Sequence, residues 1–505
     1  MRNRNTRLTT LLTAGLAAAS LAALTPETLL TPSKASHAST ATKSLRQYTQ
    51  QELRWTPCDA QGSDTLQCAS LKVPLDYRNP GGKTISLAIS RLRAGSEQDR
   101  RGVLLLNPGG PGAPGLHLPT DPVMKFPAEV KRRYDLVGFD PRGVGRSTPV
   151  SCGLTAEEQA DHPYKAQTFA KDRDRVRSFA GKCRARAGDK LPHLTTRNSA
   201  RDMDVIRAVL GEKRISYLGA SYGTYLGAVY MQLFPQRADR IVLDSATAPA
   251  RIYRGMFQDM AKAAEQAFTR WTVWTARRHT AYGLGDTPAK VRKTYWNLIA
   301  QANRKPIPFQ GQALTGDDIR ADNSTFFHLR KAAERITRLK DVAKGGNPAP
   351  SGTPGQARQP DDNFASIAWS FMCADTRTWS HDPERYRREA IRDKARYPLY
   401  GDFAAAITPC AFWEQGSEPQ TTIDNKVGAL ITQNEWDSQT PLFSGRAMHR
   451  ALRGSRMLTV AGGEGHGVLY APDGNPCADK AATAYLTTGR LPAQDLTCQA
   501  TSGHK

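Results

Sequence analysis

The chain has 505 residues, of which 39% are hydrophobic and 23% are charged, and its formal net charge is +23. This length predicts two or three domains, or one large domain with an insertion, and the apolar and aromatic content excludes a largely disordered chain. A basic balance is typical of nucleic-acid-binding proteins, but the lysines and arginines are spread along the chain without a dense basic run, so we expect a basic soluble surface and no nucleic-acid partner.

The N-terminus has the pattern of an export signal. Basic residues at Arg2, Arg4 and Arg7 precede an apolar stretch at 8–24. Small residues follow at Ser36 and Ala38, so we expect cleavage near Ala38; the alternative is an earlier cut in the alanine-rich stretch. The alternative, a membrane anchor, is disfavoured because the apolar stretch is short and interrupted by threonine. We therefore predict that the segment before residue 39 is a signal peptide, 1–38, and that the mature protein is secreted and extracellular without stable membrane association.

Eight cysteines are consistent with export, because disulfides form in oxidising compartments. The sequence does not determine their pairing, and buried free thiols are the alternative. The simplest scheme joins sequential neighbours: Cys58 with Cys68, Cys152 with Cys183, Cys373 with Cys410, and Cys477 with Cys498. Because no CxxC motif or Cys/His cluster is present, we expect no metal site.

Eight apolar, β-rich runs recur along the chain and predict strands. They are 70–76, 84–92, 102–107, 135–139, 215–219, 240–244, 427–432 and 456–460. Several are continuous runs of valine, leucine and isoleucine, as expected for strands that are buried on both faces. Helical patterns lie between some of them, at 199–210 and 221–233. Strands that alternate with helices predict an α/β fold with a mostly parallel sheet, here of eight strands.

The interval 248–422 interrupts this alternation, because its pattern is mainly helical and rich in tryptophan. Within it, 344–362 is rich in Gly, Pro and Gln and predicts a loop. We interpret the interval as a helical cap that is inserted into an α/β core. The core then comprises 39–247 before the cap and 423–505 after it.

The sequence Gly219-Ala220-Ser221-Tyr222-Gly223 matches G-x-S-x-G, which by itself is a weak signal. Its context strengthens the signal, because the motif follows an apolar run and opens a helical pattern. A sharp strand-to-helix turn requires glycines, and it exposes the serine hydroxyl at a helix N-terminus that favours negative charge. We therefore predict that Ser221 is a nucleophile; the alternative is a glycine-rich turn with a surface serine.

A serine hydroxyl needs a base to remove its proton, and in folds with this turn the acid and then the histidine follow the serine along the chain. His466 lies between two glycines just after the last predicted strand, so we predict that it is the base. The acid is expected after the preceding strand, where Asp437 is our choice and Glu435 is the alternative. The carboxylate would fix the histidine tautomer and stabilise the imidazolium.

An oxyanion formed at Ser221 needs two backbone N–H donors. We predict that one is Tyr222, directly after the nucleophile, and that the other comes from the loop after the third strand. That loop reads Asn107-Pro108-Gly109-Gly110-Pro111-Gly112. Its glycines permit close backbone approach, and Gly110 is the preferred donor with Gly109 next; the alternative is a plain turn.

Taken together, these motifs resemble those of a known family. They are similar to those of secreted bacterial tripeptidyl aminopeptidases and occur in the same order. The motifs are the loop at 107–112, the run Phe139-Asp140-Pro141-Arg142-Gly143-Val144-Gly145-Arg146-Ser147, the motif around Ser221, Asp437 with Thr440-Pro441, and Gly465-His466-Gly467. These are α/β-hydrolases related to the proline iminopeptidases, and their relatives include carboxylesterases. The resemblance spans residue 50 to the end. One departure is Ser245, because relatives often carry glycine after the preceding aspartate.

The resemblance implies an α/β-hydrolase fold with an inserted cap, and removal of tripeptides from the free N-terminus of peptides without a cofactor. An aminopeptidase also needs an acid that pairs with the substrate ammonium, and the predicted cap offers Asp375, Glu414 and Glu265. Two other functions stay open: a secreted carboxylesterase of the same fold, and a non-catalytic binding protein on a hydrolase scaffold. The intact serine, aspartate and histidine argue against the second. We expect a monomer whose partners are peptide substrates.

Overall fold

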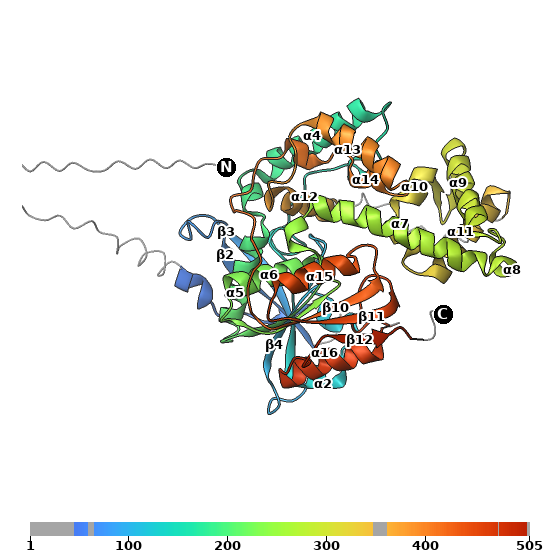
Figure 1. The fold of residues 1–505 in the computed structure, drawn as a ribbon. Coiled ribbons are helices and arrows are strands. Elements are labelled where there is room, and N and C mark those ends of the chain that lie inside the picture. The colour runs from blue at the N-terminus through green and yellow to red at the C-terminus, as the bar shows by residue number, and fades with distance from the viewer. Residues whose placement is uncertain (1–44, 59–64, 347–360, 473, 502–505) are drawn as a thin grey trace, which may run out of the picture.

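A large twisted sheet forms the centre of the protein. The computed structural model describes residues 45–58, 65–346, 361–472 and 474–501, so the predicted signal peptide and most of the predicted loop at 344–362 lie outside the described residues. Ten strands of the described part join one sheet, in the order β1-β2-β3-β5-β4-β6-β7-β10-β11-β12 (Figure 1). Their bounds are β1 Thr56–Pro57, β2 Leu66–Pro74, β3 Thr84–Leu92, β4 Gly102–Asn107, β5 Tyr134–Phe139, β6 Ile215–Ala220, β7 Ala238–Asp244, β10 Ala429–Trp436, β11 Arg456–Glu464 and β12 Leu496–Gln499.

The prediction of a mostly parallel sheet is confirmed. The pairings from β5 through β4, β6, β7, β10 and β11 to β12 are all parallel, whereas β1, β2, β3 and β5 pair antiparallel. Each of the eight predicted runs forms a strand. The predicted number of strands was wrong, because the short edge strands β1 and β12, of 2 and 4 residues, are too brief to show a hydrophobic pattern.

Helices cover both faces of this sheet. On one face lie α5 Thr196–Val209, α6 Tyr222–Leu233 and α15 Leu442–Ala451, and on the other lie α2 Ala128–Arg133 and α16 Pro476–Thr488 (Figure 1). Successive residues of a strand enter opposite layers: Leu243 packs in the cluster that contains α6, and Val242 packs in the cluster that contains α16. Burial on both faces explains why the central strands are continuous apolar runs.

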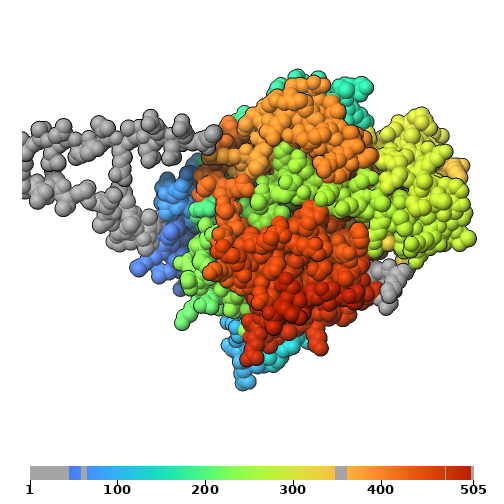
Figure 2. Space-filling view, viewed as in Figure 1, coloured from blue at the N-terminus to red at the C-terminus, as the bar shows by residue number. Residues whose placement is uncertain are grey.

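The predicted cap interval is mainly helical, and its surface adjoins that of the C-terminal part of the core (Figure 2). Its helices belong to two apolar clusters. Helices α7, α9 and α11 pack around Phe268, Trp271 and Tyr295 in a cluster of their own, whereas Phe371 of α12 belongs to the cluster of the α/β core. The helices and strands of the interval are α7 Arg254–Ala276, α8 His279–Tyr282, α9 Pro288–Arg304, β8 Ile307–Phe309, β9 Gln312–Leu314, α10 Gly316–Ala321, α11 Leu329–Ala343, α12 Asn363–Ala374, α13 Pro383–Arg396 and α14 Gly401–Ala404.

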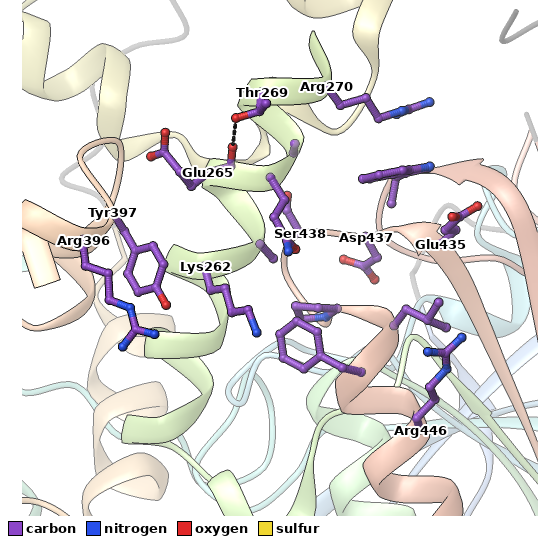
Figure 3. A pocket seen from close by; sticks show the side chains of 17 residues that line it. Lys262, Glu265, Thr269, Arg270, Arg396, Tyr397, Glu435, Asp437, Ser438 and Arg446 are labelled. Atoms are coloured by element: carbon purple, nitrogen blue, oxygen red, sulfur yellow. Dashed lines mark hydrogen bonds between the residues drawn. The ribbon is translucent and has the colours of Figure 1, made fainter. Parts of the chain in front are cut away.

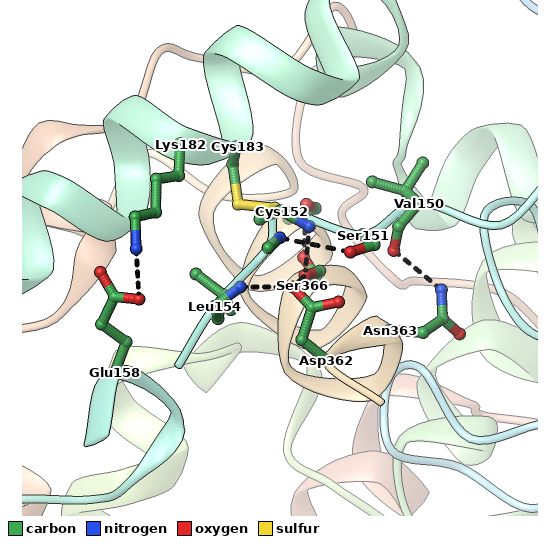
Figure 4. The surroundings of a disulfide bond; sticks show 12 residues. Val150, Ser151, Cys152, Leu154, Glu158, Lys182, Cys183, Asp362, Asn363 and Ser366 are labelled. Carbon is green, nitrogen blue, oxygen red and sulfur yellow. Dashed lines mark hydrogen bonds and ion pairs between the residues drawn. A yellow bond between two sulfur atoms is a disulfide. The ribbon is translucent and has the colours of Figure 1, made fainter. Parts of the chain in front are cut away.

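Residues between β5 and α5 also contact the predicted cap interval. This connection contains α3 Ala156–Gln159 and α4 Phe169–Ala187. The carboxylate of Asp362 accepts the N–H of Leu154 at 2.8 Å, and the hydroxyl of Ser366 accepts the N–H of Cys152 at 3.0 Å (Figure 4). The first turn of α12 is therefore fastened to a segment that precedes it by about two hundred residues.

Four disulfides hold the described chain, and they join the pairs predicted as sequential neighbours. They are Cys58–Cys68, Cys152–Cys183, Cys373–Cys410 and Cys477–Cys498. The disulfide in Figure 4 joins Cys183 of α4 to Cys152, which lies in the loop segment that contacts α12. Among the described residues, no helix combines the length and the hydropathy needed to cross a membrane.

Candidate active site

Ser221 lies at the turn between β6 and α6. Its φ of 56° is in the left-handed region that residues other than glycine rarely adopt, as the sharp turn of this motif requires. A Cβ at Gly219 would lie 2.5 Å from the ring of Tyr217 and 2.6 Å from the carbonyl of Gly223, so packing requires the first glycine of the motif. The turn places Ser221 at the carboxyl edge of the sheet, directly before the N-terminus of α6.

The loop after β4 approaches this turn closely. A Cβ at Gly109 would lie 2.6 Å from the carbonyl of Ala220 and 3.3 Å from the backbone nitrogen of Tyr222. The N–H of Gly109 donates to the side-chain carbonyl of Asn107 at 3.1 Å and is therefore engaged. This geometry favours the N–H of Gly110, together with that of Tyr222, as the pair of donors that could face an oxyanion.

His466 and Asp437 are in contact. Nδ1 of the imidazole lies 2.8 Å from Oδ2 of the carboxylate, and the Asp437 side chain is fully buried. The hydroxyl of Thr440 donates to the same Oδ2 at 2.8 Å, and the N–H groups of Gln439 and Thr440 donate to Oδ1 at 2.8 and 3.0 Å. Glu435 is engaged elsewhere, because its carboxylate accepts the N–H of a β11 residue at 2.7 Å.

These contacts change the acidity of the imidazole. Burial of His466 lowers its pKa, but the charge and hydrogen bond of Asp437, with a contribution from Asp244, outweigh burial and raise the pKa above its ordinary value. With Nδ1 directed at the carboxylate, Nε2 is the nitrogen that can accept a proton from a nucleophile.

Asp244, the last residue of β7, connects the serine turn with the histidine loop. Its backbone carbonyl accepts the N–H of Ser221 at 2.9 Å. Its buried carboxylate accepts the N–H groups of Val468 and Leu469, at 3.0 and 3.1 Å, and the hydroxyl of Thr432 at 2.8 Å. Burial raises the pKa of Asp244.

The next residue, Ser245, extends this connection. Its hydroxyl accepts the N–H of Gly467 at 2.9 Å, one residue after His466. The φ of Ser245 is 55°, which accounts for the glycine that relatives often carry here, because glycine adopts this conformation without strain. Ser221 and His466 are thus both attached to the end of β7.

Comparison with known proteins identifies the family of this chain. A family model described as "alpha/beta hydrolase fold" matches residues 102–335, and one described as "TAP-like protein" matches residues 397–498. The chain is 37% identical to a tripeptidyl aminopeptidase of Streptomyces lividans, in an alignment that covers 88% of this chain and 86% of that protein. The chain belongs to the tripeptidyl aminopeptidase family of the α/β-hydrolases.

Other relatives of this family are more distant. Serine protease Hip1 of Mycobacterium tuberculosis is 30% identical, and the alignment covers 89% of this chain and 91% of that protein. Carboxylesterase B of Mycobacterium tuberculosis is also 30% identical, with 88% of this chain and 89% of that protein covered. This member of the tripeptidyl aminopeptidase family is a serine hydrolase.

The three acids considered for the substrate ammonium lie in different surroundings in this family member. Glu414 is 76% exposed and forms an ion pair with Arg184. Glu265 lines a cavity beside the Asp437 loop, where it pairs with Arg292 at 3.2 Å. Asp375 is buried and lies within a network that reaches the residue next to Ser221.

The Asp375 network is formed by hydroxyl groups. The carboxylate accepts the N–H of Thr196 at 2.7 Å, the hydroxyl of Thr196, and the hydroxyl of Tyr253 at 2.9 Å. Since the Thr196 hydroxyl donates to Asp375, its oxygen accepts the hydroxyl of Tyr222 at 2.7 Å. Burial raises the pKa of Asp375 to about 6, although its hydrogen bonds oppose this shift.

Two residues that sequence reasoning missed hold the histidine loop. The side-chain amide of Asn434 donates to the carbonyls of Glu464, Gly465 and Gly467 at 3.0–3.1 Å. The buried carboxylate of Glu464 pairs with Arg270 of α7 at 2.7 Å. Both residues flank predicted catalytic residues at strand ends, and that position is the only signal in the sequence that could have indicated them.

Proposed function

We propose that this protein is an exported serine exopeptidase that releases tripeptides from the free N-terminus of peptides. The observation that carries the proposal is the contact between His466 and Asp437, at the same sheet edge as the strained Ser221. The similarity to a tripeptidyl aminopeptidase supports the substrate class. The four disulfides support export, since such bonds persist in oxidising compartments.

In the proposed reaction, Ser221 attacks the carbonyl of the third substrate residue while Nε2 of His466 takes its proton. The N–H groups of Tyr222 and Gly110 stabilise the tetrahedral oxyanion, and each donor contributes about 2.7–4 kcal/mol in comparable sites. His466 then protonates the leaving nitrogen. Water, activated by the same imidazole, hydrolyses the acyl-enzyme and frees the tripeptide.

We assign recognition of the substrate ammonium to Asp375. It is the one of the three candidate acids that contacts the network of Tyr222, beside the nucleophile. A carboxylate can accept about four hydrogen bonds, and Asp375 accepts three, so acceptor capacity remains for an ammonium. In the Ser221→Ala background, Asp375→Asn should weaken the binding of free-amine peptides and spare that of their N-acetylated forms, and equal effects on both would exclude this role.

The alternative of a carboxylesterase is favoured by the similarity to carboxylesterase B. A substrate comparison separates the functions. Cleavage of a tripeptide anilide but not of its N-acetyl form supports the aminopeptidase, and activity confined to short acyl esters supports the esterase. Failure of a fluorophosphonate to label Ser221 supports the non-catalytic binding protein.

A further inference from the structure

A large cavity lies beside the loop that carries Asp437. It has a volume of about 880 Å³ and lies between α7, the loop after β10 and the start of α15 (Figure 3). We call it the acid-loop groove. This volume is within the usual range of ligand sites, about 300–1,000 Å³. Its lining includes the aromatic rings of Tyr397, Trp436 and Phe443.

The available charge in the acid-loop groove is positive. Lys262, Arg396 and Arg446 line it, and among the described residues no ion pair joins any of the three to a carboxylate. Lys262 extends from α7 (Figure 3). Its Nζ lies over the ring of Phe443, 5.1 Å from the ring centroid. A ligand that reached these three side chains would meet cations that have no competing internal partner.

The acids of the groove each have an internal partner. Glu265 pairs with a cap arginine and also accepts the N–H of Leu399 at 3.1 Å. Glu435 accepts a backbone N–H of β11, which leaves its charge uncompensated, and Asp437 binds His466. The four cations that line the groove outnumber its three acids, so the groove favours a ligand that carries carboxylate groups.

The chemistry of the proposed reaction indicates which part of a substrate lies on this side. His466 must protonate the leaving nitrogen, so the leaving chain emerges on the His466 side of Ser221. The groove is lined by Asp437, whose carboxylate contacts His466. The substrate ammonium, three residues before the cleaved bond, belongs on the opposite side, where Asp375 and Tyr222 lie.

We propose that the acid-loop groove binds carboxylate groups of the leaving peptide, with Lys262, Arg396 and Arg446 as the cations that select it. This proposal rests on the proposed exopeptidase function, because only a peptide substrate carries a further peptide chain on the leaving side. The carboxylate comes either from an acidic side chain or from the C-terminus of a short peptide, and the experiment below distinguishes these two sources.

The experiment measures binding without turnover. Full-length Ser221→Ala protein is titrated with hexapeptides that share one N-terminal tripeptide and differ in the second, which carries either glutamate or glutamine, each as a C-terminal acid and as an amide. We expect carboxylate-bearing peptides to bind about threefold to tenfold more tightly than the matching peptides without that carboxylate. The expected difference is small because exposed ion pairs are individually weak. Added salt should reduce this preference.

Variants then locate the preference. The quantity compared is the ratio of the affinities for carboxylate-bearing and neutral peptides. In the Ser221→Ala background, Lys262→Gln/Arg446→Gln should bring this ratio close to one. The control Lys293→Gln/Lys305→Gln, which alters exposed lysines of the same interval outside the groove, should keep the ratio of the Ser221→Ala protein. Thermal unfolding checks that each variant is folded. A dependence on glutamate identifies the side chain as the ligand, and a dependence on the free C-terminus identifies the terminal carboxylate.

Two results would overturn the proposal. One is a ratio near one in both the glutamate and the C-terminus comparisons, and the other is a preference that persists in Lys262→Gln/Arg446→Gln. Failure of the exopeptidase function is seen separately, as a lack of tripeptide-anilide cleavage by the wild-type protein, since the anilide has no peptide on the leaving side.

Discussion

The carboxylate of Glu464 lies 2.7 Å from the guanidinium of Arg270, and this ion pair joins the histidine loop to α7. Glu464 is only 3% exposed and also accepts the N–H of Leu329, at the start of α11, at 3.3 Å. The Arg270 side chain lies over the ring of Trp436, 4.6 Å from its centroid. Because Glu464 is two residues before His466, these contacts connect the helices of the predicted cap to the proposed base.

Loss of this ion pair should therefore impair catalysis. Glu464→Gln and Arg270→Gln are each expected to lower kcat, because the histidine loop loses one of its supports. In a double-mutant cycle the two effects should be non-additive, with a coupling of about 1 kcal/mol, or roughly fivefold in kcat. Asp286→Asn, which breaks an exposed ion pair of the same interval, should leave kcat unchanged. Strictly additive effects would show that the pair does not act on His466.

The pH dependence of activity should reflect the contact between His466 and Asp437. Below its pKa the imidazole is protonated and cannot accept the proton of Ser221, so kcat/KM falls as the pH falls through that pKa. Because Asp437 raises the pKa of His466, the acidic limb should lie above the ordinary value of about 6.5.

Asp437→Asn should move this limb to lower pH and reduce kcat, in comparable triads by roughly ten-thousandfold. The limb is measured from kcat/KM profiles of the wild-type protein and the variant. Glu435→Gln is the matched control, since Glu435 does not contact His466. A limb that stays in place after Asp437→Asn would exclude Asp437 as the residue that sets the pKa.

Asp244 should support both stability and activity. Asp244→Asn puts an amide NH₂ where backbone N–H groups now donate, so buried donors lose their acceptors, at a cost of about 1–3 kcal/mol in the free energy of unfolding. Denaturant unfolding and kcat are measured on the same samples. Ser245→Gly, which removes a strained φ and one hydrogen bond, should change stability little. Wild-type stability and kcat in Asp244→Asn would show that its carboxylate does not hold the histidine loop.

Asp375 should make stability depend on pH. Burial raises its pKa to about 6 in the folded protein, whereas an aspartate in the unfolded chain has a pKa near 3.9. The folded state therefore binds more protons between these values, and this contribution to stability is present at low pH and is lost as the pH rises from about 4 to 6. The loss is on the order of 2–3 kcal/mol.

The difference in unfolding free energy between wild type and Asp375→Asn isolates this effect, because other groups titrate equally in both proteins. Relative to the variant, the wild type should become less stable as the pH rises from 4 to 7. A difference that stays constant would mean that Asp375 keeps an ordinary pKa, and a change in the opposite direction would mean that folding lowers this pKa.

The strands and the proposed catalytic residues could be predicted because their signals are local. Leu104 and Leu105 point into different apolar layers, so a strand buried on both faces is apolar at every position. Ser221 lies in a turn whose first glycine, Gly219, is required by contacts with residues only a few positions away. Such patterns do not depend on distant parts of the chain.

The supports of the site could not be predicted, because their partners are far away in sequence. Asp244 and Val468 are 224 residues apart, and nothing near either residue indicates the other. The same is true of the cap interval, where the apolar pattern around Phe371 does not reveal that this residue of α12 joins the cluster of the α/β core rather than the cluster of Phe268. Only the folded arrangement shows these contacts.

The most direct test of the proposed function is a digest of a peptide library, read by mass spectrometry. We predict that the wild-type protein releases fragments of three residues from free N-termini, that N-acetylated copies stay intact, and that Ser221→Ala releases nothing. Fragments of another length, internal cleavage, or product formation by Ser221→Ala would contradict it.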